Sequence, residues 1–269
     1  MQIMKLLSLK KESFVNLQQA FDKFNGAYMV GEDKIDGVAV KITYDHGEFI
    51  QACTRKVCVT DSVLKIKNVP KSINQDGLLE VTGEAYYHKR NVDNHRSVVS
   101  GLLRTGLNMD GIEFVAHGVS ASMSRYYTQA MDSLLALGFD TVPGRICKTF
   151  KDVVEFYQER EFERSGLDYE IDGVVFKVND RNIQREMGYT NHHPRWAFAC
   201  KFPPRYCNVI IRDIGITDKG TLIAKFDEVV IGGIRVKKAV IYEKDNHKIG
   251  DLVNVKMVGD VIPVISKCW

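Results

Sequence analysis

Two apolar runs of the sequence each contain a single lysine. Lys177 lies within Val174–Val178 and Lys201 within Phe198–Phe202, in stretches typical of strands at 172–178 and 196–202. Burying an ammonium group among apolar neighbours is costly unless an anion meets it. The sequence therefore predicts either a sheet in which both lysines face an anionic group, or edge strands whose lysines reach solvent.

A third lysine lies in the stretch Glu32-Asp33-Lys34-Ile35-Asp36-Gly37. A lysine that attacks phosphorus must lose its proton, so it needs nearby cations or a metal, partial burial and a carboxylate that orients it. If the stretch is extended, Glu32, Lys34 and Asp36 share one face. Gly37 then leaves room for a phosphate or for backbone. The alternative is a surface lysine on a solvated strand.

Further stretches accompany these lysines in a fixed order. The stretches are Cys53-Thr54-Arg55, Val81-Thr82-Gly83-Glu84, Asn94-His95-Arg96, Gly101-Leu102-Leu103-Arg104, Ile171 to Asn179, and Arg195 to Pro203. In that order, they resemble the adenylation domain of the NAD-dependent DNA ligases over about residues 1–207, and less strictly through 259–263 into the start of an OB domain.

The resemblance implies roles for the three lysines and two acids. Lys34 is the expected nucleophile, which forms a phosphoramide with AMP, and Lys177 and Lys201 are expected to meet the α-phosphate. Asp36 and Asp172 are expected to orient the lysine or to help bind a divalent cation, although either could instead cap a turn.

The resemblance also implies contacts to nucleotide and DNA. Glu84 matches a ribose-binding glutamate, and Glu32 matches the acid beside the adenine, a role that backbone contacts could equally serve. His117 falls where the family has a tyrosine that stacks on adenine. Arg55 is expected to bind the nucleotide, and any one arginine alone is more often part of a surface salt bridge. The arginines expected to bind DNA are Arg96, Arg104, Arg164 and Arg195.

Hydrophobic periodicity and turn residues predict mixed α/β structure of the α+β type. A hairpin is expected around Asp45-His46-Gly47, and the helix at 150–163 is expected to be capped by Thr149. Other helices are predicted at 11–25, 97–104, 125–137 and 184–187, and other strands at 78–87 and 113–119.

After Pro203-Pro204 short strand-like runs recur. They are separated by Asp218-Lys219-Gly220, Gly232-Gly233 and 248–251. Short strands with glycine turns indicate a small β-barrel. We therefore expect an adenylation, or nucleotidyltransferase, domain at 1–207 and a partial OB-fold domain at 208–269.

The composition sets bounds on the environment of the chain. The formal charge of +3 means that affinity for nucleic acid must come from the arrangement of cations. The six cysteines form no C-x-x-C pair, so free thiols in a reducing compartment are expected. No apolar run approaches the roughly 18 residues of a membrane span. We expect a cytoplasmic protein of a bacterial cell or an infected host, without a membrane partner.

Several positions depart from the family pattern. Lys56-Val57-Cys58 replaces the glycine-aspartate-glycine that normally follows Arg55, and Thr82 replaces an arginine. Asp218-Lys219-Gly220 and Lys256-Met257 also stand where arginines are usual. These losses weaken the expectation that the chain alone binds DNA strongly.

The family's nicotinamide-recognising module has no counterpart before Leu6, and its zinc, helix-hairpin-helix and C-terminal modules have none after Trp269. The expectation is a fragment, or one subunit of a split ligase, such as a viral one, that a separately encoded partner chain completes.

The predicted activity is NAD-dependent DNA ligation of nicked duplex DNA, with Mg²⁺ offsetting the developing charge. Two alternatives stay open: an ATP- or GTP-dependent RNA ligase or capping-type nucleotidyltransferase, and a non-catalytic nucleic-acid-binding subunit.

Overall fold

The computed structural model describes residues 6–88, 95–120, 124–203, 206–218, 220–231, 234–242, 246–258 and 262–266. The described residues form two compact units, one ending at Phe202 and one beginning at Pro203. Among these residues, no helix has the length and apolar content needed to cross a membrane. The predictions for Asn94, Lys219, Gly232-Gly233, Gly259-Asp260-Val261 and Trp269 lie outside the described residues.

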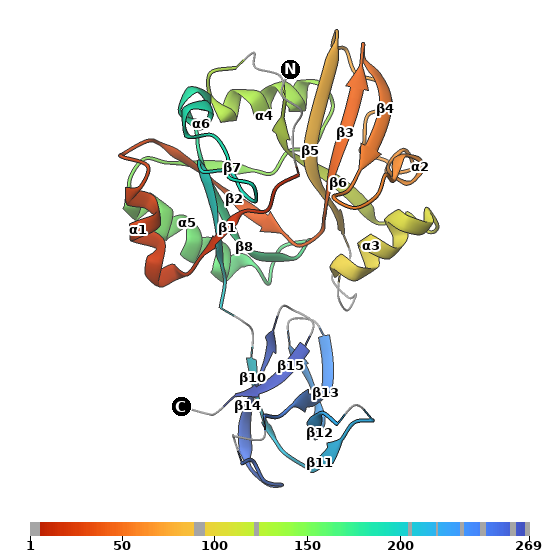
Figure 1. Cartoon of the computed structure of the whole chain (residues 1–269), viewed down its shortest axis with the longest axis vertical. Coiled ribbons are helices and arrows are strands. Elements are labelled where there is room, and N and C mark those ends of the chain that lie inside the picture. The colour runs from red at the N-terminus through yellow and green to blue at the C-terminus, as the bar shows by residue number, and fades with distance from the viewer. Residues whose placement is uncertain are drawn as a thin grey trace. The chain divides into compact units, whose positions relative to one another are not determined.

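The first unit contains a five-stranded sheet with the order β1-β9-β8-β2-β7. Only β1 and β9 run parallel. Helices α1 (Leu17–Asp22) and α5 (Phe150–Glu163) pack on this sheet and share its apolar core (Figure 1). The strands are β1 (Lys10–Glu12), β2 (Met29–Ile35), β7 (Gly144–Cys147), β8 (Ile171–Val178) and β9 (Ala197–Lys201).

Helix α5 begins and ends as the sequence predicts. The Thr149 side chain accepts from the Asp152 amide at 3.3 Å, and the Asp152 carboxylate accepts from the Thr149 amide at 2.9 Å. This reciprocal pair satisfies donors that a helix start leaves unpaired. The helix packs closely on β2, because a Cβ added to Gly31 would lie 2.6 Å from the Phe156 ring.

The same unit contains a four-stranded antiparallel sheet with the order β4-β3-β5-β6. The predicted hairpin is confirmed: His46 and Gly47 both have positive φ, as a two-residue type I′ turn requires. The elements are β3 (Val38–Asp45), β4 (Glu48–Cys53), β5 (Leu78–Tyr87), β6 (Ile112–Val119), α2 (Thr60–Val63), α3 (His95–Thr105) and α4 (Tyr127–Ala136).

Some local predictions are corrected. The predicted helix at 11–25 is shorter, because Lys10–Glu12 pairs with β9 as β1 and a 3-10 turn, η1 (Phe14–Asn16), precedes α1. Strand pairing thus overrides helical periodicity in the first residues of that segment. The short helix near 184–187 is α6 and begins earlier (Arg181–Met187).

The second unit is a curved six-stranded sheet with the order β10-β14-β15-β13-β12-β11. Strand β10 also packs against β12, and alternate side chains fill one apolar core, as in a partial OB-like barrel. The strands are β10 (Tyr206–Ile210), β11 (Asp213–Ile216), β12 (Leu222–Ile231), β13 (Ile234–Val240), β14 (Leu252–Val258) and β15 (Ile262–Ser266).

Candidate active site

Lys34 lies at the end of β2, where the chain leaves the five-stranded sheet for the four-stranded one. Asp36 follows outside the strand, and its amide donates to the Glu170 carbonyl at 2.9 Å. At Gly37, an added Cβ would lie 2.2 Å from the Ala85 carbonyl oxygen of β5. Of the two uses predicted for this glycine, the structure therefore supports close backbone approach.

Asp172 occupies a β-bulge. Lys34 pairs with Gly173, whereas the next residue of β2, Ile35, pairs with Ile171, so Asp172 is an extra residue on β8. Regular alternation would place Asp172 on the face opposite Gly173. A bulge re-aims a side chain, and here it directs the carboxylate toward Lys34.

Two ammonium groups meet this carboxylate. Lys34 Nζ donates to Oδ1 of Asp172 at 2.6 Å, and Lys201 Nζ lies 2.7 Å from Oδ2. Gly173 lies between the two lysines in the sheet, paired with Lys34 on one side and Lys201 on the other. We call Lys34, Asp172 and Lys201 the Asp172 cluster.

The Asp172 cluster keeps its carboxylate ionised. Burial alone would raise the pKa of Asp172, but the charges and hydrogen bonds of Lys34 and Lys201 hold it below the ordinary value. The cluster thus places two cationic groups and one anion together on one sheet.

A second group of side chains lies farther along the same strands. Lys177 Nζ lies 2.6 Å from Oε2 of Glu32 and donates to the Tyr127 hydroxyl at 2.7 Å and to the His117 carbonyl at 3.0 Å. Oε1 of Glu32 is buried and has no hydrogen-bond partner among the described residues. We call Glu32, Lys177, Tyr127 and His117 the Glu32 cluster.

The two lysines of the apolar runs therefore have different surroundings. Lys201 belongs to the Asp172 cluster, whereas Lys177 is four residues beyond Gly173 on β8, about 13 Å along the strand. Both lysines meet an anion, which is the first of the two alternatives predicted from the sequence. Only Lys201 shares that anion with Lys34.

His117 is also the extra residue of a bulge, because Thr82 pairs with Gly118 and Gly83 pairs with Ala116. Burial, and then the charge of Lys177, lower the pKa of His117 to about 3, so its imidazole is neutral at physiological pH. A neutral ring is suited to stacking, although the structure itself assigns His117 only backbone contacts to Lys177 and Tyr127.

Glu84 lies on β5, half-buried, opposite Ala39 of β3. Burial raises its pKa to about 7, although the nearby charges of Lys34, Arg96 and Arg55 oppose the shift. Lys34, Arg96 and Arg55 therefore all lie near enough to Glu84 for their charges to act on it. Glu84 therefore changes its protonation near neutral pH.

Replacing Glu84 with glutamine is expected to remove a pH dependence of stability. Because the folded pKa of about 7 exceeds the ordinary 4.5, the folded state binds the proton more tightly, and this stabilisation is lost as pH rises from 4.5 through 7. The wild type should lose up to about 3 kcal/mol relative to Glu84→Gln across that range. Urea unfolding of both proteins at pH 5 and pH 8 measures the difference. Parallel pH profiles would contradict the prediction.

The remaining predicted arginines are spread over several elements. Arg96 and Arg104 are exposed on α3, and Arg195 is exposed just before β9. Arg164 follows α5 and its guanidinium lies over the Phe202 ring, 5.1 Å from the centroid. The charge of Arg96 acts on Glu84, and Arg164 packs against an aromatic side chain.

The prediction of free thiols is wrong for one pair. Cys53, at the end of β4, and Cys58 form a disulfide, because a tight turn between them brings the two residues opposite each other. Arg55 lies in this turn and donates to the Ser8 hydroxyl at 3.1 Å. The other described cysteines, Cys147, Cys200 and Cys207, are free.

The predicted divalent-cation site has little support in the geometry. Within the described ranges, no three His, Cys, Asp or Glu side chains come together in a way that could hold a metal ion. Each carboxylate oxygen of Asp172 already faces an ammonium group. These residues do not form a ready-made cation site.

Comparison with known proteins identifies the family. Residues 8–205 match the model of the NAD-dependent DNA ligase adenylation domain. The chain belongs to this family. The family predicted from the sequence is therefore confirmed.

The similarity of this chain to known DNA ligases extends beyond the adenylation domain. A DNA ligase of Bacillus cytotoxicus is 33% identical over 288 residues, and one of Bacillus cereus is equally similar. Each alignment covers 93% of this chain but only 43% of the relative, so the chain spans less than half the length of these ligases. A solved structure from a study of Lig E DNA ligases shares the fold, with a TM-score of 0.52, 14% identity and 99% coverage of both chains.

Three residues near the site escaped the sequence analysis. Tyr127 lies at the start of α4 and completes the Glu32 cluster, whereas Arg160 and Tyr169 hold Asp33. Side chains alternate along β2, so Asp33 lies on the face opposite Lys34. This alternation was the only sign in the sequence that Asp33 contacts other partners than Lys34 does. The partners of Asp33 are 127 and 136 residues away, so local patterns could not identify them.

Proposed function

We propose that this chain is the adenylation part of an NAD-dependent DNA ligase, with Lys34 as the nucleophile. The Asp172 cluster is the observation that supports this assignment. Lys34 Nζ attacks the α-phosphorus of NAD, a nitrogen–phosphorus bond forms, and the anhydride bond to nicotinamide mononucleotide breaks. Lys34 attacks as the neutral amine, after its ammonium group has released one proton to solvent. The nitrogen releases a second proton to solvent as the lysine-AMP phosphoramide forms, and nicotinamide mononucleotide leaves with the electron pair of the broken bond.

In this proposal Asp172 and Lys201 have separate roles. The Asp172 carboxylate orients the Lys34 amine, and the ionised state of Asp172 at neutral pH allows it to accept a hydrogen bond. The Lys201 ammonium, on the other carboxylate oxygen, stabilises negative charge that develops on the α-phosphate. Asp36 lies two residues beyond Lys34 and is proposed to assist in the same region.

The Glu32 cluster is suited to bind the adenine base. The edge of adenine offers an amino donor beside a ring-nitrogen acceptor, and Glu32 and Lys177 present a carboxylate acceptor beside an ammonium donor. The unpartnered Oε1 of Glu32 would accept from the amino group. In the same proposal Glu84 binds the ribose, His117 stacks on the base, and Arg55 contacts the nucleotide.

The later steps involve nicked duplex DNA. AMP passes from Lys34 to the 5′-phosphate of the nick, and the 3′-hydroxyl then attacks and releases AMP. Arg96, Arg104, Arg164 and Arg195 are proposed to bind DNA phosphates, because guanidinium groups pair well with phosphate. Domain limits of 1–207 and 208–269 belong to this proposal.

Sealing is proposed to need protein parts beyond this sequence, either on the same chain or on a separately encoded partner. The relatives, which are more than twice as long, support this view. Mg²⁺ is proposed to arrive with the substrate phosphates and to take only one or two carboxylates from the protein, Asp36 and Asp172 being candidates, which is its usual mode of binding.

Intact mass spectrometry tests the first step. The purified chain is incubated with NAD, and separately with ATP, each with Mg²⁺. We expect a gain of one AMP with NAD and none with ATP. A gain with ATP alone would contradict NAD as the donor, and the absence of any gain would contradict adenylation by this chain on its own.

A further inference from the structure

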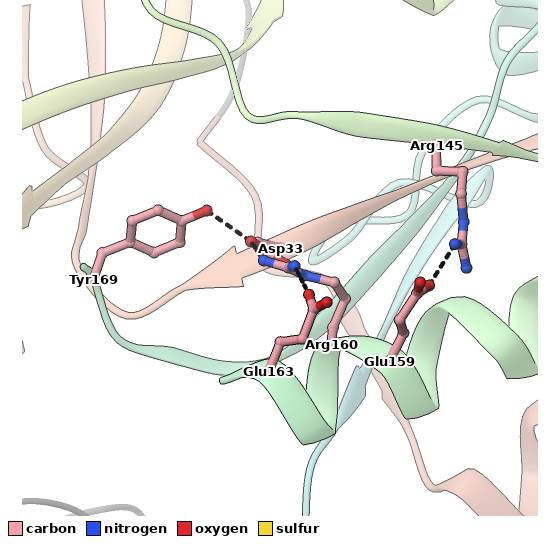
Figure 2. Close-up of polar contacts among 6 residues, drawn as sticks. All are labelled: Asp33, Arg145, Glu159, Arg160, Glu163 and Tyr169. Carbon is pink, nitrogen blue, oxygen red and sulfur yellow. Dashed lines mark hydrogen bonds and ion pairs between the residues drawn. The ribbon is translucent and has the colours of Figure 1, made fainter. Parts of the chain in front are cut away.

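Asp33 precedes Lys34 in β2 but points to the opposite face, toward α5. Its side chain is only 3% exposed. Arg160 of α5 donates from Nε to Oδ1 at 2.6 Å and from Nη2 to Oδ2 at 2.5 Å, and the Tyr169 hydroxyl donates to Oδ2 at 2.7 Å. Figure 2 shows Arg160 and Tyr169 approaching Asp33 from different segments. We call these three residues the Asp33 clamp.

The clamp is geometrically specific. A guanidinium that binds a carboxylate through two parallel hydrogen bonds fixes both distance and orientation, which a single ammonium group does not. Hydrogen bonds and the charge of Asp33 raise the pKa of Arg160 above its already high ordinary value. Arg160 also donates from Nη1 to Glu163 at 2.5 Å, one turn later in α5, so the guanidinium itself is held.

The segment after α5 contacts the chain on both sides of Lys34. Tyr169 binds Asp33, the residue before Lys34, and the carbonyl of the next residue, Glu170, accepts from the amide of Asp36 at 2.9 Å. The Tyr169 ring also packs edge-on against Tyr86 of β5, with centroids 5.6 Å apart. Residues 169–170 thus tie down the end of β2 where it leaves the sheet.

We propose that Arg160 and Tyr169 are positioning residues for Lys34. They act through Asp33 and the Glu170 carbonyl, on the face of β2 opposite Lys34. These contacts hold the Lys34 backbone in place, so that Nζ keeps its hydrogen bond to Asp172. The inference rests on the proposed role of Lys34 as nucleophile. A displacement of about 1 Å in a reacting group can cost about 100-fold in rate, so loosening this strand end should slow the chemical step.

The test measures the rate of AMP attachment as a function of NAD concentration. Arg160→Gln is expected to lower the maximal rate about 10- to 100-fold, with less than about a threefold change in the half-saturating NAD concentration, because the clamp lies on the far face from Lys34. Arg160→Lys should stay slow, because an ammonium group cannot reproduce the two-point contact. Tyr169→Phe removes one neutral donor, preserves the fold, and should lower the maximal rate about 3- to 10-fold.

Hydrogen exchange provides a second readout. Amides of residues 29–37 are expected to exchange faster in Arg160→Gln and Tyr169→Phe, with little change in the four-stranded sheet. The double variant of Asp33→Asn and Arg160→Gln should be about as slow as the slower single variant, because both remove the same contact.

The matched control is Glu159→Gln. Glu159 lies on the same helix and accepts from Arg145 in an exposed ion pair that does not involve Asp33 (Figure 2). Its rate, corrected for the folded fraction from thermal unfolding, should equal that of the wild type.

The inference is overturned if Arg160→Gln and Tyr169→Phe match Glu159→Gln, or if they raise only the half-saturating NAD concentration. If the wild type itself takes up no AMP, the proposed function fails and this inference fails with it. Activity in the wild type with no effect in the clamp variants overturns the inference alone.

Discussion

AMP attachment is expected to disappear when Lys34 is replaced by alanine and to persist at a reduced rate when Lys201 is replaced. Both ammonium groups contact the same carboxylate, at 2.6 and 2.7 Å, so proximity to Asp172 does not distinguish the nucleophile. Loss of the nucleophile removes the bond-forming atom. Loss of Lys201 removes one stabilising charge, for which a decrease of about 10²- to 10³-fold is typical.

Lys34→Arg is the matched variant for this experiment. Arginine keeps the positive charge beside Asp172 but stays protonated, so it cannot attack phosphorus. Intact mass gives the extent of attachment, and peptide mapping of the wild type gives the modified residue. An AMP group mapped to Lys201, or retained in Lys34→Ala, would refute the assignment.

Replacing Glu32 with glutamine is expected to destabilise the chain by about 3–5 kcal/mol, because it leaves the Lys177 charge buried without its anion. The two side chains are 2% and 7% exposed, so water cannot replace the lost partner. Adding Lys177→Met removes that charge and should restore more than half of the stability. The double variant should still attach AMP at least about 100-fold more slowly, because both polar contacts proposed for adenine are gone.

Urea unfolding and intact mass measure the two effects separately. Asp110→Asn is the control for stability, because it breaks the exposed ion pair with Lys67 and should change the free energy of unfolding by less than about 1 kcal/mol. A double variant no more stable than Glu32→Gln would show that the buried charge is not the cause. A double variant with normal attachment would remove the Glu32 cluster from the proposed adenine site.

Local sequence patterns were sufficient for elements whose ends are defined by local chemistry. The 150–163 helix begins at a capping box, and the hairpin turns at two residues of positive φ. Strand β5 also matches its predicted limits. The patterns were insufficient at β1 and β7, which are short and become strands only by pairing with β9 and β2.

The same distinction between local sequence and tertiary structure applies to the candidate site. The sequence by itself determined the family, the three lysines and the acids, because their residue types and order are written in the chain. It also limited Lys177 and Lys201 to two alternatives, a facing anion or an edge strand that reaches solvent, because an unpaired buried charge is too costly.

Only the tertiary structure decided which anion each lysine meets. A strict alternation of side chains would have turned Asp172 away from Lys34, and one extra residue in β8 reverses this. The tertiary structure also pairs Lys177 with Glu32, and it brings Arg160 and Tyr169 within hydrogen-bonding distance of Asp33. These pairings depend on strand register and on contacts between residues more than 100 positions apart, which no local pattern encodes.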